Sequence, residues 1–108
     1  MTISVLLVTG SVNAGEAALP EPPVPAQKEA ERELRKTFGN PGKGTSEARS
    51  LARKLLETGK DTRDRPSYRF VLFREARDIA AEAGDLETAL LAAQAISEYY
   101  RVDSRRMR

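Results

Sequence analysis

The chain has 108 residues, contains no cysteine and no histidine, and carries 18 basic against 16 acidic side chains, for a net charge of +2. The composition excludes disulfide bonds, thiolate metal sites and any site that needs an imidazole as base or ligand. The length suffices for one small domain, and the interspersed charges are typical of solvated helical surfaces, not of a stripe that binds nucleic acid.

A short apolar run opens the chain at residues 3–8, and Val-Asn-Ala follows at residues 12–14. Small residues spaced in this way are the pattern that signal peptidase recognises, with cleavage before Gly15. We therefore expect residues 1–14 to be a signal segment and the protein to be exported, to the periplasm, the cell surface or the medium. The run is too short to cross a bilayer, so we expect no membrane span.

The alternative for the same segment is a buried strand of a truncated nucleotide-binding fold. Residues 5–8 are apolar, and Gly10 and Gly15 have the spacing of a P-loop. However, Glu16 stands where that motif needs lysine, and a carboxylate there would repel phosphate. No alternation of strands and helices follows, which favours the signal segment.

Residues 15–25 are rich in proline and predict a flexible, extended linker. Residues 26–45 predict a weak helix to about Phe38 and then a glycine-rich loop. The apolar face of this helix would consist of Ala30, Leu34 and Phe38.

Residues 46–108 predict a helical module that begins after Thr45 or Ser46, since either side chain can cap a helix. We expect Gly59 to end its first helix, followed by a polar loop. The apolar stripe of this helix consists of Ala48, Leu51, Ala52, Leu55 and Leu56.

The next two helices are predicted to form an antiparallel hairpin. Pro66 lies in the first turn of the third helix, where a missing N–H costs nothing, and Gly84 is its left-handed terminator. Asp85 caps the fourth helix, and so short a link reverses the chain. The predicted inner faces are Leu72, Ala76, Ile79, Ala80 and Ala83 on the third helix, and Leu86, Ala89, Leu90, Ala93, Ile96 and Tyr100 on the fourth. The fold class is therefore all-α, a small antiparallel helical bundle or hairpin.

The segment from Ala83 to Leu90 resembles the turn and second-helix start of a tetratricopeptide repeat. Gly84 and Asp85 match the turn of that repeat, and Ala89 matches its small second-helix residue. The resemblance implies one tetratricopeptide-like helical hairpin, a unit that usually stacks on neighbours to bury its faces.

A wider stretch, residues 46–103, resembles a helical region near the N-terminus of large secreted or surface planctomycete proteins of unknown function. The matching sequences are Leu-Ala-Arg-Lys-Leu-Leu from residue 51, the Thr-Arg-Asp-Arg-Pro loop, Arg-Glu-Ala-Arg-Asp-Ile-Ala-Ala-Glu-Ala-Gly-Asp from residue 74, and Tyr-Tyr-Arg-Val-Asp from residue 99. The resemblance implies an exported location and a role within a larger protein or assembly, and it implies no reaction.

Four sequence features are candidates for chemistry, and each has a simpler interpretation. The loop at residues 39–45 is glycine-rich with a lysine before a helix, but its order is wrong for a P-loop and predicts a linker. Five carboxylates surround the hairpin, and Arg74 and Arg77 predict surface ion pairs for them. These carboxylates are Glu75, Asp78, Glu82, Asp85 and Glu87.

The other two candidates concern nucleic acid. Aromatic side chains beside arginines could stack on bases, but aromatics at helical spacing more often form a core. The aromatic residues are Tyr68, Phe70, Phe73, Tyr99 and Tyr100. The basic end at residues 105–108 predicts at most weak, salt-sensitive binding without sequence preference.

We therefore expect a non-catalytic, exported helical module for protein–protein interaction or spacing, without cofactor or metal. Its partner would be another protein or a second copy, because one repeat-like unit leaves apolar surface on the outer side of the hairpin. The alternative is a small basic nucleic-acid-binding protein. The expected interaction surface is Phe70, Phe73, Arg74, Arg77, Leu91 and Tyr99.

Overall fold

A computed structural model of the chain describes residues 19–42 and 44–101. The described part is all-α, as predicted, with four helices: α3 (Val24–Phe38), α4 (Thr45–Asp61), α5 (Pro66–Glu82) and α6 (Leu86–Tyr99). The expected signal segment, residues 1–14, and the basic end, residues 105–108, lie outside the described residues. Among the described residues, no helix is both long and apolar enough to cross a bilayer.

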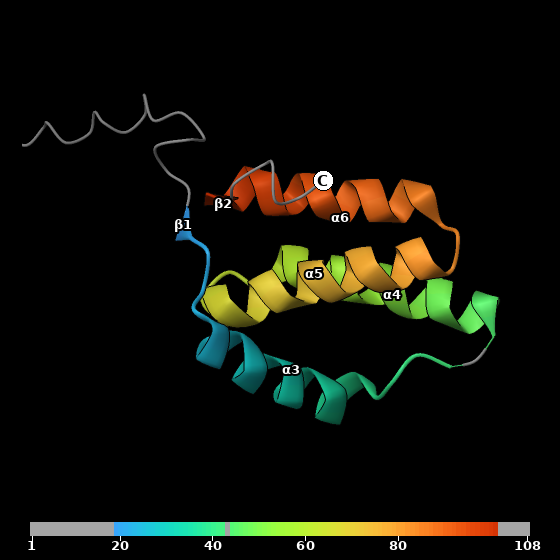
Figure 1. Ribbon diagram of the computed structural model, residues 1–108, viewed down its shortest axis with the longest axis horizontal. Helices are drawn as coiled ribbons and strands as arrows, with labels where there is room; N and C mark the ends of the chain where they lie inside the picture. The colour runs from blue at the N-terminus through green and yellow to red at the C-terminus, as the bar shows by residue number, and fades with distance from the viewer. Residues whose placement is uncertain (1–18, 43, 102–108) are drawn as a thin grey trace, which may run out of the picture.

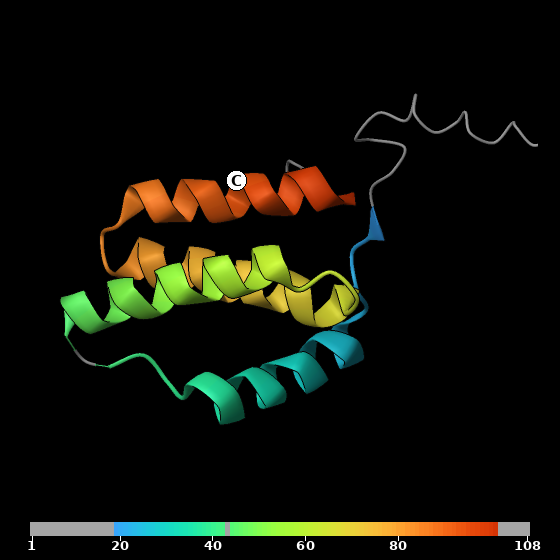
Figure 2. The same cartoon turned by 180° about the vertical axis from the view of Figure 1, so that it is seen from behind.

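Helix α5 is the centre of the bundle and contacts the three other helices. Helices α4 and α5 lie side by side, and α3 and α6 flank this pair on opposite sides (Figures 1 and 2). The start of α5 is buried nearly all round, because α5 is covered from three directions. Its buried residues are Tyr68, Phe70, Val71, Leu72, Phe73, Ala76, Ile79 and Ala80.

Two residues before α3 and two residues after α6 form a minimal parallel pairing. Strand β1 (Leu19–Pro20) pairs with β2 (Tyr100–Arg101), with Leu19 opposite Tyr100. This pairing brings the segment before α3 to the end of α6 (Figure 1). The described part of the expected linker is therefore in contact with the bundle, and α3 begins at Val24, two residues before the predicted start.

The hairpin of α5 and α6 forms at the predicted turn. Gly84 has φ +80°, and the N–H groups of Gly84 and Asp85 donate to the carbonyls of Ala81 and Ala80 at 3.1 and 2.8 Å. These two bonds are the C-terminal capping pattern that a left-handed glycine allows. Asp85 then caps α6, and its carboxylate accepts from the backbone N–H and the hydroxyl of Thr88 at 3.2 and 2.7 Å. The hydrogen bond from the Thr88 hydroxyl has the larger effect in lowering the pKa of Asp85, followed by the bond from the Thr88 N–H. The positive charge of Arg53 lowers this pKa further.

The prediction that Gly59 ends the second helix is wrong, because α4 continues through it to Asp61. Gly59 is buried, and a methyl group there would lie 2.6 Å from the ring of Phe73. The glycine therefore lets α5 approach α4 closely. The start of α4 also differs from the prediction, because Gly44 occupies the cap position and no side chain caps the helix.

The inner face predicted for the fourth helix is wrong at two of its six residues, and Ala89 packs against the core as predicted. Ile96 and Tyr100 are buried as predicted, but Leu86 and Leu90 are 67% and 64% exposed. The residues that α6 buries are Thr88, Ala92, Ala95 and Ile96. Small side chains face α5 because the bulky residues of α5 already fill the space between the two helices.

Candidate functional site

The interaction surface expected from the sequence is not one surface in the structure. Phe70 and Phe73 are 5% and 0% exposed, so the expectation that they lie on the outer side of the hairpin is wrong. Phe73 packs against Gly59 of α4 and stacks on Tyr99, and Phe70 meets the edge of Tyr100 with ring centroids 5.1 Å apart. Both phenylalanines are buried because α4 and the end of α6 pack over the start of α5. The hairpin of α5 and α6 without α4 would leave them exposed.

The two arginines of that expected surface form ion pairs with carboxylates. Arg74 is mostly buried and donates to Glu31, to Glu75 at 3.0 Å and to the side chain of Gln27 at 2.7 Å. Burial opposes its charge, but the hydrogen bonds to Glu75 and Glu31 outweigh burial and raise the pKa of Arg74.

Arg77 donates to Asp78 at 2.9 Å, so the surface ion pair predicted for this arginine is confirmed. Of the expected surface, only Leu91 and Tyr99 are exposed, to 42% and 36%. Tyr99 is itself covered on one face, because the guanidinium of Arg69 lies 3.8 Å from its ring centroid.

The aromatic residues proposed as possible base-stacking platforms are mainly core residues, as expected. Tyr68, Phe70, Phe73 and Tyr100 are all buried. The hydroxyl of Tyr100 donates to the carbonyl of Pro66 at 2.6 Å, and burial raises the pKa of this phenol to about 12.

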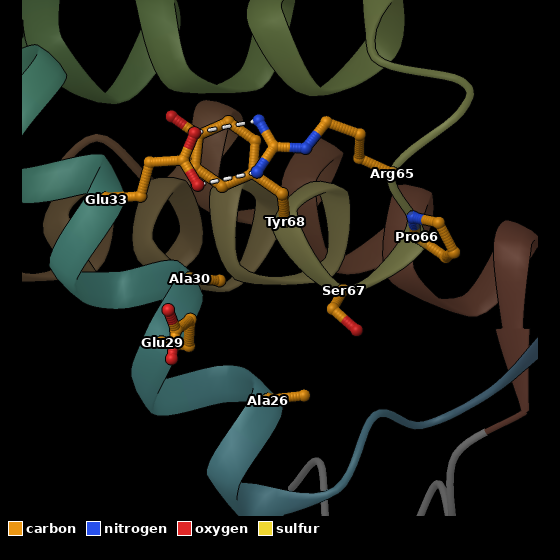
Figure 3. Close-up of a pocket in the computed structure, with 8 residues that line it drawn as sticks. All are labelled: Ala26, Glu29, Ala30, Glu33, Arg65, Pro66, Ser67 and Tyr68. Carbon is orange, nitrogen blue, oxygen red and sulfur yellow. Dashed lines mark hydrogen bonds and ion pairs between the residues drawn. The ribbon is translucent and has the colours of Figure 1, made fainter.

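A hollow of about 340 Å³ lies between α3 and the start of α5 (Figure 3). Its wall includes Glu33 and Arg65, which form two hydrogen bonds of 2.5 and 2.8 Å beside the ring of Tyr68. The hydrogen bond from Arg65 lowers the pKa of Glu33. Glu29, the other charged residue of the wall, pairs with Arg32 at 3.2 Å. The charged groups are thus satisfied by one another, and the hollow presents few polar groups to a ligand.

A smaller hollow of about 160 Å³ lies beside the glycine-rich loop and the start of α4. The carboxylate of Glu47 lies against Gly42, and Glu82 lines the hollow from α5. Two carboxylates beside the N-terminus of α4 disfavour phosphate there, which agrees with a linker and not with a nucleotide site.

On the outer side of α6, the sequence patterns predicted only Leu91 among the leucines to be exposed. Three leucines are exposed there, to 67%, 64% and 42%, and we call Leu86, Leu90 and Leu91 the outer stripe. In both views α6 forms one side of the bundle, with α4 and α5 on its inner side (Figures 1 and 2). The signal in the sequence was that α6 is apolar on almost every side, which a buried helix or a helix between two partners requires.

Comparison of the chain with protein-family models, with curated proteins and with solved structures finds no match.

Proposed function

We propose that this chain is a non-catalytic helical module that binds a protein partner through the outer side of α6. The observation that carries the proposal is the outer stripe, because three leucines remain exposed on a helix whose other side already packs on α5. A small protein that keeps a cluster of large apolar side chains in water usually uses them as a contact surface. Elsewhere in the described part, the large apolar residues are buried or partly buried, apart from Leu19, Val24 and Tyr99.

The test compares the full chain with the double variant Leu86→Ser/Leu90→Ser by sedimentation velocity and by a dye that fluoresces on exposed apolar surface. The matched control is Val24→Ser, since Val24 is 62% exposed but lies on α3. We expect the double variant alone to lose dye binding and any association, with its unfolding free energy changed by less than about 1 kcal/mol. A wild-type chain that is strictly monomeric and binds no dye would contradict the proposed contact surface, and the module would then be a spacer.

We further propose that the module acts outside the cytoplasm, on the pattern of residues 1–14 alone. N-terminal sequencing of the protein from the culture medium and from the cell envelope checks this proposal. A first residue at Gly15 is expected, whereas an intact Met1 confined to the cytoplasm contradicts export.

A further inference from the structure

The outer side of α6 has the geometry of a seam between two helices. Leu86, Leu90, Ala93 and Ser97 follow one another at spacings of four, three and four residues. This spacing keeps side chains in line along one face of a helix and is the repeat by which two helices pack. The large residues lie in the first half of the line, and the small ones in the second half leave room for large side chains of a partner.

The charges beside this line have one sign. Between Leu86 and Tyr99 the helix carries two carboxylates, Glu87 and Glu98, and no lysine or arginine. Both glutamates are exposed, and helical geometry places them with Leu91 on the same flank of the line. Charges at the edge of a helical seam select the partner, because an opposite charge across the seam is favourable and a like charge is not.

From this juxtaposition we infer that the occupant of the outer stripe is an amphipathic helix of another protein, with an apolar seam flanked by lysine or arginine. This inference rests on the proposed function and names the class of partner. The leucines supply the apolar contact, and Glu87 and Glu98 select for basic flanking residues. This contact would be a two-helix seam of the coiled-coil type, with one edge of the seam acidic.

A second copy of the chain is a poorer occupant. Two α6 helices packed together present only glutamates at the seam, in the parallel and the antiparallel orientation alike, since α6 has no basic residue. Two arginines of other helices contact α6 at its ends, and Arg69 lies over the ring of Tyr99 with its guanidinium 3.8 Å from the ring centroid. Arg53 lies 3.6 Å from Asp85, at the very start of the helix, and is engaged there.

The experiment uses the full chain and two synthetic amphipathic peptides that share one leucine seam, flanked by lysine in one peptide and by glutamate in the other. Fluorescence anisotropy measures the affinity of each peptide for the wild type, for Leu90→Ser and for Glu87→Lys/Glu98→Lys. We expect the wild type to bind the lysine peptide about five- to tenfold more tightly than the glutamate peptide, because two exposed ion pairs contribute about that much. The charge-reversed variant should prefer the glutamate peptide, and Leu90→Ser should weaken binding of both.

The matched control is the charge reversal Glu29→Lys/Glu57→Lys, because both residues are exposed and lie on α3 and α4. It changes the net charge as much as the α6 variant does and should leave the preference for lysine intact. Equal binding of both peptides, or a preference that the control also reverses, overturns the inference and leaves the proposed function standing. Self-association that depends on Leu90 also overturns it, because a second copy is then the occupant. Failure of both peptides, of association and of dye binding together defeats the proposed function itself.

Discussion

The two helices that flank α5 are held to it by different physics. On one side, α3 buries only Ala30 and Leu34, and its contact with α5 includes the ion pairs of Arg74 with Glu31 and of Arg35 with Glu75. On the other side, α6 meets α5 through Ile96, small residues and the stacking of Tyr99 on Phe73. Just after α6, the hydroxyl of Tyr100 donates to the carbonyl of Pro66 at the start of α5.

The difference extends to the outer surfaces of the two helices. The outward side of α3 is charged and well solvated, with Lys28, Glu29, Arg32 and Lys36 exposed, whereas the outward side of α6 carries the outer stripe. A helix that is fastened by ion pairs and has a charged outer face has little apolar surface left to bury. A helix that is apolar on both sides has one face still to be covered. The comparison therefore supports the proposal that the interaction surface lies on α6, while the ion pairs of α3 fasten that helix to α5.

The largest effect is expected at the apolar side of α5. Phe73→Ala should lower the free energy of unfolding by about 3–5 kcal/mol, because the ring is fully buried between Gly59 and Tyr99. Urea denaturation, followed by the helical circular dichroism signal, measures this loss as a shift in the midpoint of the unfolding transition.

The companion variant Gly59→Ala sharpens this test. Its methyl group would lie 2.6 Å from the Phe73 ring, so we expect a loss of about 1–3 kcal/mol in the wild type and almost none in the Phe73→Ala background. If Gly59→Ala stabilises the wild type through helix propensity, the close approach of α4 and α5 is wrong.

The link at the end of α6 should make stability fall in strong alkali. The pKa of Tyr100 is raised from 10.0 to about 12 by burial, so the folded state favours the neutral phenol. Its contribution is fully present below pH 10 and is lost as the pH rises from 10 to about 12, by at most about 2–3 kcal/mol. Urea midpoints of the wild type and of Tyr100→Phe across this range measure the loss, and the variant should lack this component. Parallel curves for the two proteins would contradict the burial of the phenol.

On the polar side, Arg74→Met keeps an apolar stem of similar length and removes the ion pairs that fasten α3. We expect a loss of about 1–2 kcal/mol, since Arg74 is mostly buried but Glu31 is 41% exposed. Hydrogen exchange should show α3 opening more readily while α4 and α5 stay protected. The matched control is Arg32→Met, whose ion pair with Glu29 is exposed on both sides and should contribute less than about 0.5 kcal/mol. Equal losses for the two variants would show that burial of the ion pair does not matter.

The smallest effect is expected at the outer stripe. Leu90→Ala should change the unfolding free energy by less than about 0.5 kcal/mol, because Leu90 is 64% exposed. On the same helix, Ile96→Ala should cost about 2–5 kcal/mol, since Ile96 is fully buried. Thermal melts measure both losses. A larger drop in melting temperature for Leu90→Ala than for Ile96→Ala would show that the buried face of α6 is assigned wrongly.

Much of the local structure was predictable from short-range chemistry. Pro66 in the first turn of α5, the left-handed Gly84 and the Asp85 cap are all where the sequence predicted them. Such signals are reliable because each depends on the backbone requirements of a single residue and not on its neighbours in space.

The faces of the hairpin were harder to predict, for two reasons. Helix α6 offers apolar residues on almost every side, so periodicity could not choose between Leu90 and Ala92 as the inward residue. The sequence pattern also treated the hairpin as a unit by itself, which left Phe70 and Phe73 on an outer side. Both phenylalanines are covered because α4 and the end of α6 close over the start of α5.

The sequence by itself determined the helical class, the turn at Gly84 and the absence of thiol and imidazole chemistry, because these follow from residue types and local backbone preferences. Only the tertiary structure decided that Gly59 is a packing contact instead of a helix end, and that Arg74 fastens α3. It also decided that the leucines of α6 face outward, because the large side chains of α5 already fill the interior and only the alanine side of α6 fits against them.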